Sequence, residues 1–220
     1  MITLTRRDAK HSYVKGKRYH VTLIGELPGV TTVLDATNNF DFTKWRKDNP
    51  EESQRCLNRG LELHDSIELY FSFQNETANY LIANKLFDKL YGDVLKHIKP
   101  VVWEHQVYSR LGYSGSLDCL GYYKDKLTLF DWKTSTKTKT PSQVTNYLIQ
   151  VAAYAHALNE LDGVLVDQCA AAIIPEESNR CQLFKIDGDD INAYFDEFKK
   201  RLRRFDSMQC KGLDRDSMAS

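Results

Sequence analysis

Two aspartates and a lysine in segment 114–139 are the residues of this chain whose types and spacing most directly indicate chemistry. Apolar-rich runs flank the polar pair Lys124-Asp125, which is the pattern of strand, turn and strand. A loop of two or of four residues gives the same pairing, and both place Asp118 opposite Asp131. Directly opposed residues share a face of the sheet, with Cβ atoms about 5 Å apart. We therefore expect the two carboxylates to lie side by side.

Carboxylates at this spacing repel each other, so the hairpin requires a compensating cation. Hard divalent ions such as Mg²⁺ or Mn²⁺ prefer carboxylate oxygens and are held by one or two carboxylates plus substrate phosphates. Strand alternation places Lys133 on the face of Asp131, while Trp132 points the other way. An ammonium beside a metal-bound water suits phosphodiester hydrolysis, because it orients the nucleophile or stabilises developing charge. The alternative is a surface hairpin with scattered charges.

Helical segments on both sides of the hairpin carry further polar candidates. The upstream segment has a helical period that places His64 on one inward stripe with Leu57 and Leu61. In the downstream segment Gln150 and Tyr154 are four residues apart and share one helix face. A histidine on an apolar face and an aromatic row are also typical of a plain hydrophobic core, and the residue types leave both readings open.

An ordered set of residues thus runs along the chain: His64, Asp118, Asp131-Trp132-Lys133, Gln150 and Tyr154. This order resembles the PD-(D/E)xK nuclease superfamily and, within it, the RecB-like exonuclease branch. The resemblance implies an α/β fold with a restriction-endonuclease-like core, in which helices flank a central mixed β-sheet and an N-terminal helical region precedes it. One departure is Gly29, which stands where that branch usually has a serine.

The resemblance also implies roles in a metal-dependent site. His64 would approach the metal from its helix, and Glu104 on the preceding strand would complete the metal shell. The backbone carbonyl of Trp132 would add a ligand. Gln150 would orient the attacking water or a metal-bound phosphate oxygen, with Tyr154 as support. A simple charge at the sheet edge is the alternative for Glu104. The catalytic set expected from these considerations is Asp118, Asp131, Lys133, Gln150 and Tyr154.

Several basic, aromatic and hydroxyl residues near these motifs are candidates for DNA contacts. Arginine and lysine side chains reach backbone phosphates, and an indole stacks on unpaired bases. Solvated surface charges and a buried tryptophan are equally compatible with these residue types. The candidates are Trp45, Arg46, Arg55, Arg59, Ser135, Lys137 and Lys139.

The overall composition limits the function classes. Lys and Arg total 30 and Asp and Glu total 30, so the net charge is zero and any DNA contact must come from a local basic patch. The five cysteines show no C-x-x-C spacing, which favours a reducing compartment and gives no support for an iron–sulfur cluster. Apolar runs are too short for a membrane span, and the N-terminus lacks a signal or a clear transit peptide. We expect a cytoplasmic location, in a bacterial or phage-infected cell, and no membrane partner.

The chain length suits a single domain with a sizeable core. We expect a hairpin and helical region at 1–99, packed on a nuclease core at 100–206, and a flexible tail at 207–220. A ribbon at 13–27 that turns at Lys15-Gly16 is expected to be peripheral.

Together these features predict a metal-dependent DNA exonuclease, a Mg²⁺- or Mn²⁺-dependent deoxyribonuclease that acts on single-stranded ends. The preference for ends and for single strands comes only from the resemblance. A structure-selective or restriction-like endonuclease and a non-catalytic nucleic-acid-binding subunit with the same fold are the alternatives. The sequence leaves cleavage polarity and oligomeric state open.

Overall fold

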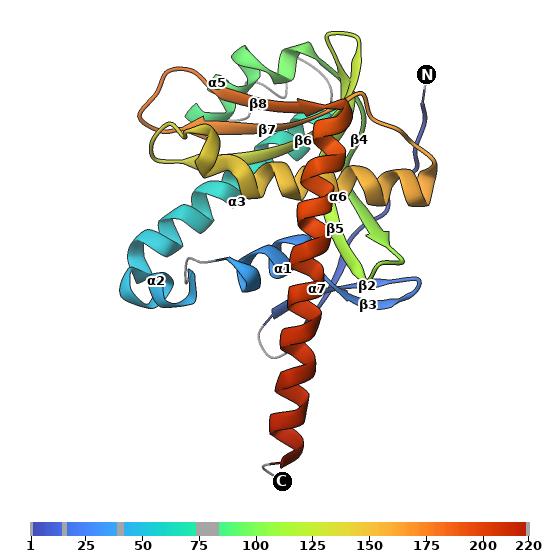
Figure 1. The fold of residues 1–220 in the computed structure, drawn as a ribbon. Helices are drawn as coiled ribbons and strands as arrows, with labels where there is room; N and C mark the ends of the chain where they lie inside the picture. Colours follow the sequence, from blue (N-terminus) through green and yellow to red (C-terminus); the bar gives the residue numbers. More distant parts are fainter. Residues whose placement is uncertain (1, 15–16, 39–41, 74–83, 219–220) are drawn as a thin grey trace.

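A five-stranded mixed β-sheet forms the centre of the protein in the computed structural model, which describes residues 2–14, 17–38, 42–73 and 84–218. The strand order is β4-β5-β6-β7-β8, in which only the β6–β7 pair is parallel. A parallel pair needs a crossover, and helix α6 supplies it. The predicted α/β fold with a mixed sheet between helices is therefore confirmed (Figure 1). The strands are β4 (Ile98–Ser109), β5 (Tyr113–Tyr123), β6 (Lys126–Ser135), β7 (Gln168–Pro175) and β8 (Gln182–Asp187).

The β5–β6 hairpin has the predicted register. Tyr123 pairs with Lys126 and Cys119 pairs with Phe130, so the loop consists of two residues. Lys124 and Asp125 have φ angles of +50° and +65°. This left-handed pair is the geometry of a type I′ turn, whose twist matches that of the flanking strands. The ladder hydrogen bonds thus outweigh the poor intrinsic preference of the two turn residues.

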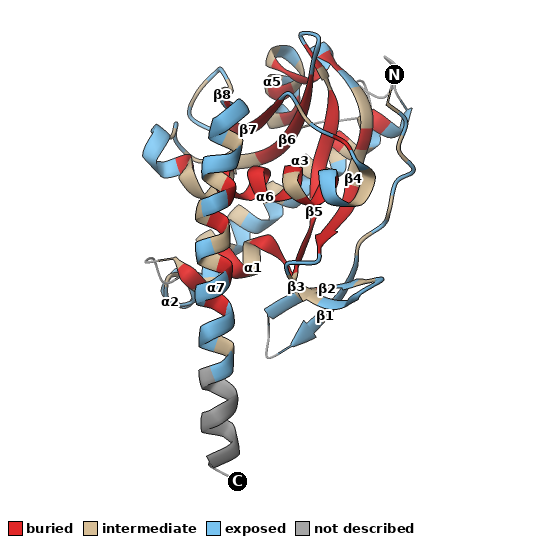
Figure 2. Cartoon of the chain, turned by 45° about the vertical axis from the view of Figure 1, so that its right-hand side comes forward, coloured by how far each residue is buried: buried red, intermediate tan, exposed pale blue. Residues whose placement is uncertain are grey.

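Helices cover both faces of the sheet and create two apolar clusters (Figure 2). On one face α6 is buried along most of its length, since α1, α7 and the sheet surround it. On the other face α3 and α5 pack over Phe130 and Trp132. Trp132 is only 1% exposed, so it points away from the predicted site as expected. The helices are α1 (Val30–Thr37), α2 (Phe42–Asp48), α3 (Pro50–Phe73), α5 (Lys85–Asp93), α6 (Thr145–Asp162) and α7 (Gly188–Met218), with short 3₁₀ turns η1 (Leu95–His97) and η2 (Pro141–Val144).

A second, three-stranded sheet is formed by β1 (Lys10–Val14), β2 (Lys17–Thr22) and β3 (Gly25–Pro28). The predicted turn at Lys15-Gly16 lies outside the described residues. The sheet is tied to the core by side chains as well as by backbone: Gln106 donates to the Val21 carbonyl at 3.0 Å and Ser114 donates to the Leu27 carbonyl at 3.1 Å.

The C-terminal helix α7 includes most of the segment where a flexible tail is expected, and the flexibility of that segment stays a prediction. Helix α7 continues past Phe205 to Met218, and it extends away from the sheet (Figure 1). No proline follows Gly188, so nothing in the sequence forces the helix to stop earlier. The division of the chain at residues 99 and 206 stays a prediction. Within the described ranges, no helix is both long and apolar enough to cross a membrane.

Candidate active site

Three acidic residues occupy neighbouring positions on adjacent strands: Glu104 on β4, Asp118 on β5 and Asp131 on β6. Cys119 of β5 pairs with Trp103 of β4 and with Phe130 of β6. Each acidic residue is the sequence neighbour of one of these three, on the same side of the row. Glu104 has a φ of +45°, which is uncommon for a residue with a side chain and costs about 1–3 kcal/mol. Such strain persists only where the surrounding structure fixes it, and it clusters at functional sites.

His64 of α3 completes a group of ligand-type atoms over this row. Its Nδ1 lies 3.4 Å from Glu104 Oε1, and its Nε2 lies 3.8 Å from Asp118 Oδ2. The Nε2 atom is also 3.3 Å from the Trp132 carbonyl oxygen, and the Trp132 N–H donates to Asp118 Oδ2 at 2.7 Å. One ligand atom each from His64, Glu104 and Asp118 lie within 4.8 Å of one another. This spacing would allow one metal ion to bind all three.

Asp131 has a different set of partners. Lys133 Nζ lies 2.8 Å from its Oδ1 and 2.7 Å from its Oδ2, and Gln150 Nε2 donates to Oδ1 at 2.8 Å. The same Gln150 nitrogen is 3.1 Å from the Tyr154 hydroxyl. The structure therefore brings together every residue of the predicted catalytic set, with Asp118 on the His64 side and Asp131 on the Lys133 side.

Close packing of α6 on β5 positions the two site residues of this helix, Gln150 and Tyr154. A Cβ atom added at Gly115 would lie 2.2 Å from Cε1 of Tyr154, so only glycine lets the tyrosine ring approach the strand. Sequence reasoning missed Gly115. The available signal was a glycine just before the predicted strand, inside what the structure shows to be β5, since a glycine within a strand often marks a close approach of another group.

Burial dominates the electrostatics of the two aspartates. It raises the pKa of Asp131 to about 6, an effect that Lys133 only partly offsets. Burial also raises the pKa of Asp118, against the opposing effects of His64 and Lys133. Burial alone would lower the pKa of His64, but the Asp118 carboxylate and the Glu104 hydrogen bond raise it to about 9. A metal ion bound by His64 would take the place of its proton.

The residues present fit a hard divalent cation. Among the described residues, Asp131 Oδ2 is a buried oxygen that makes no hydrogen bond, and the ammonium of Lys133 is its ion-pair partner. Buried carboxylates of this kind require a counter-charge, and oxygen-rich donor sets suit Mg²⁺ or Mn²⁺. The protein thus has a His/Glu/Asp group able to hold a metal, next to a fourth donor, the carboxylate of Asp131.

A cleft of about 760 Å³ opens over the site. The predicted site residues at its floor are Glu104, Asp118, Lys133, Gln150 and Tyr154, with His64 on the α3 wall. Arg6, His11 and Arg18 line another wall, so the N-terminal ribbon is not peripheral. Sequence reasoning missed these three residues. The only signal in the sequence concerned Arg18. It lies two residues before His20, so the two basic side chains lie on one face of a strand.

The stripe predicted on α3 is only partly correct. His64 faces the site as expected, but Leu57 and Leu61 are each 55% exposed and line the cleft. The residues of α3 that enter the core are Leu63, Ile67 and Phe71.

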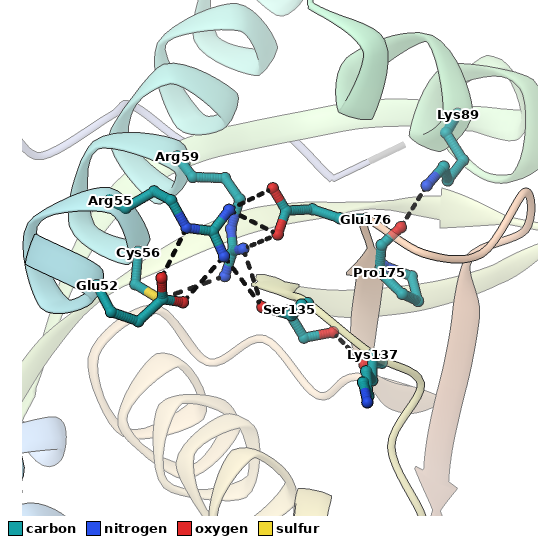
Figure 3. A network of polar contacts seen from close by, with 10 residues as sticks. Glu52, Arg55, Cys56, Arg59, Lys89, Ser135, Lys137, Pro175 and Glu176 are labelled. Carbon is teal, nitrogen blue, oxygen red and sulfur yellow. Dashed lines mark hydrogen bonds and ion pairs between the residues drawn. The ribbon is translucent and has the colours of Figure 1, made fainter. Parts of the chain in front are cut away.

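Two predicted phosphate contacts, Arg55 and Arg59, belong to a separate ionic network (Figure 3). Arg55 bonds Glu52 at 2.8 Å and Glu176 at 2.9 Å, and Arg59 also pairs with Glu176. Thr136, which follows β6, accepts from Arg55 at 3.3 Å. The network therefore fastens α3 to the segments that follow β6 and β7.

The other predicted DNA contacts also lie outside the residues that line the cleft. Ser135 is buried and donates to the Lys137 carbonyl at 2.7 Å, while Lys137 itself is exposed. The Lys139 backbone bonds Gln182. Half-buried Trp45 and exposed Arg46 lie on α2, away from the central sheet (Figure 1). Their contacts with DNA stay predictions.

The mixed sheet and the carboxylate site resemble those expected of PD-(D/E)xK-like nucleases, and comparison with known proteins agrees with this class. No protein-family model matches the chain. The curated sequences that match it are named as exonucleases, and the predicted resemblance to PD-(D/E)xK-like nucleases is confirmed. The relatives are mitochondrial genome maintenance exonuclease 1 from Homo sapiens, 26% identical over 200 residues, from Mus musculus, 29% identical over 150 residues, and from Xenopus tropicalis, 43% identical over 53 residues.

These matches are partial. The human match covers 81% of this chain and 58% of the relative, and the mouse match covers 60% of this chain and 44% of the relative. The Xenopus match covers 24% of this chain and 15% of the relative. Among solved structures, a phage-related exonuclease from Haemophilus somnus 129PT covers 84% of this chain and 95% of its own, at 10% identity and a TM-score of 0.41. That score is too low to support any argument, and the activity of the relatives is a proposal for this chain.

Proposed function

We propose that this protein is a metal-dependent deoxyribonuclease, an exonuclease that hydrolyses phosphodiester bonds at single-stranded DNA ends. The observation that carries the proposal is the row of three carboxylates next to His64 and Lys133, two of which, Glu104 and Asp118, line an open cleft. The names of the sequence relatives support exonuclease activity. The single-strand preference rests on the resemblance to the RecB-like branch.

Five groups would hold the ion: His64, Glu104, Asp118, Asp131 and the Trp132 carbonyl. The bound Mg²⁺ or Mn²⁺ would supply Lewis acidity toward the phosphate and a counter-charge for the leaving 3′ oxygen. The chain's own residues position the reaction. Lys133 donates hydrogen bonds to the attacking water from its place beside Asp131, and Gln150 fixes the Asp131 carboxylate. Tyr154 in turn holds the Gln150 amide.

Cleavage of an end-labelled single strand tests the activity. The full chain is assayed with Mg²⁺, with Mn²⁺ and with EDTA, as wild type and as Lys133→Ala. Loss of one charge-stabilising donor lowers catalysis by about 10²–10³, so the variant should be slower by that factor. Lys126→Ala is the matched control, because Lys126 lies on the same strand with a side chain that is 54% exposed. Equal metal-dependent cleavage by Lys133→Ala and wild type would remove the mechanism.

A closed substrate distinguishes the mode of cleavage. An exonuclease leaves a covalently closed single-stranded circle intact while it degrades the linear form of the same sequence. Cleavage of the circle at a comparable rate would instead indicate an endonuclease with the same site. Metal-independent binding without any cleavage would indicate a non-catalytic subunit.

A further inference from the structure

The α3 wall of the cleft carries apolar side chains that the core does not use. Leu57 and Leu61 are each 55% exposed and lie one helical turn apart. The same helix buries Leu63, Ile67 and Phe71 in the core, so packing of α3 is already satisfied. Leucines left uncovered beside a candidate active site provide apolar surface for a ligand.

Gly60 lies between these leucines and lines the same cleft. A glycine inside a helix is less favourable than alanine, because it orders a more flexible backbone. Packing does not require it here, since a Cβ atom at Gly60 would meet nothing within 4 Å. The missing side chain leaves an open shelf beside Leu57 on the wall of the cleft.

The N-terminal wall has the opposite chemistry. Arg18 of β2 is exposed and lines the cleft, and its guanidinium has no ion pair within the part of the chain that the structure describes. Arg6, on the same wall, is already paired with Glu68 at 2.8 Å and Asp8 at 3.0 Å. Arg18 is therefore the basic group left available for an anionic ligand.

We propose that these walls form the track for the unpaired strand: Leu57, Gly60 and Leu61 contact the faces of bases, and Arg18 contacts a backbone phosphate. The inference rests on the proposed nuclease function and assigns residues that select a single strand. Asp65 is a further exposed acid that lines the α3 wall, which favours uncharged bases there and phosphates along β2. A duplex hides its base faces and would gain nothing from the leucines.

Binding measured apart from cleavage tests the track. Fluorescence anisotropy with Ca²⁺ in place of Mg²⁺ compares oligothymidylate with an abasic oligomer of the same length, and the end label reports any hydrolysis. Wild type should prefer the strand with bases. The double variant Leu57→Gln/Leu61→Gln should lose about tenfold in affinity for oligothymidylate, or about 1.4 kcal/mol, and little for the abasic strand. Leu69→Gln, on the same helix and outside the cleft, is the control.

Two further variants and one control separate the walls. Arg18→Gln should weaken both oligomers alike and reduce the slope of log affinity against log salt by about 0.7, the value for one phosphate contact on a single strand. Arg110→Gln, an exposed arginine that does not line the cleft, should leave the slope unchanged. Gly60→Leu should fill the shelf and weaken oligothymidylate binding, with a melting temperature equal to or above that of wild type.

The outcomes distinguish this inference from the proposed function. Cleavage by wild type with unchanged base preference in the leucine variant overturns the track and leaves the nuclease intact. Loss of base preference in that variant, without cleavage by wild type under any metal, supports the track and removes the nuclease. Absence of binding by wild type to both oligomers overturns both.

Discussion

Asp131 and Lys133 show how the site depends on residues that are costly to bury. The Asp131 side chain is fully buried, and its stability there requires the ammonium of Lys133 at 2.7 Å and the amide of Gln150. Asp118, one strand away, has His64 and the Trp132 N–H as partners. Two buried carboxylates with separate cationic neighbours form a site that already carries the counter-charges a metal would share or replace.

The backbone strain at Glu104 can be tested by substitution. At its φ of +45° the usual order of glycine and alanine should reverse, because glycine adopts this conformation without steric cost. Glu104→Gly should therefore unfold at a higher free energy than Glu104→Ala, by about 1 kcal/mol. Chemical denaturation of both variants gives the comparison.

The control for Glu104 is Lys185, an exposed residue inside strand β8. There glycine should be the less stable of the two substitutions, by about 0.5–1 kcal/mol. If alanine were also the more stable residue at position 104, the backbone would not be strained. Both Glu104 variants should lose metal-dependent cleavage, since neither keeps the carboxylate.

Site residues could be predicted from the sequence where the spacing of the motif was fixed. Asp118, Asp131 and Lys133 follow from strand alternation and register, which local sequence determines. Arg18 and Leu57 were not predictable in the same way, because their exposure on the cleft depends on how β2 and α3 pack against the sheet. The positive φ of Glu104 has no sequence signal at all, since glutamate rarely adopts it.

At the scale of elements, the contact between α6 and β5 sets the geometry of the site. Tyr154 lies directly over Gly115, and its hydroxyl bonds the Gln150 amide that holds Asp131. The helix also supplies the crossover between the two parallel strands. One packing contact thus aligns the helix, the strand and the carboxylate.

Gly115→Ala should disturb this alignment. The added methyl group would overlap the Tyr154 ring at 2.2 Å, and overpacking of this kind costs about 1–3 kcal/mol of stability. Tyr154→Leu should remove the clash, so the double variant should be more stable than the sum of the single effects predicts. A double-mutant cycle measured by denaturation tests this coupling, and additive effects would show that the two residues are not in contact.

Periodicity predicted the type of these elements better than their limits. The hairpin register was predictable because both turn lengths give the same pairing. The length of α7 was not, since an amphipathic pattern that fades toward Met218 does not mark where a helix ends. The position of the N-terminal sheet depends on long-range bonds such as Gln106 to Val21, which no local pattern encodes.

At the scale of the whole molecule, a net charge of zero coexists with a cleft whose walls differ in chemistry. The N-terminal sheet contributes to this cleft and to stability. His20 of β2 is 1% exposed, and among the described residues neither of its ring nitrogens has a hydrogen-bond partner. Burial, followed by Arg18 and His11, lowers the pKa of His20 to about 4. The neutral ring is therefore part of the folded state.

This burial predicts a pH dependence of unfolding. The unfolded chain binds a proton at His20 near pH 6.5, while the folded chain does not until about pH 4. The stability that the neutral, buried His20 ring contributes is full above pH 6.5. It is lost as the pH falls toward 4, and the free energy of unfolding then decreases by about 3 kcal/mol at most. His20→Leu should flatten the unfolding free energy across this window. An unchanged slope in His20→Leu would contradict the assignment.

Anomalous diffraction from crystals soaked in Mn²⁺ would show whether this row of residues binds a metal, since it locates the ion without relying on activity. We expect a manganese peak bounded by His64, Glu104 and Asp118, with Asp131 next to it, and loss of that peak in Asp118→Asn. A peak elsewhere, or no peak at this row in crystals of protein that still cleaves DNA, would contradict it.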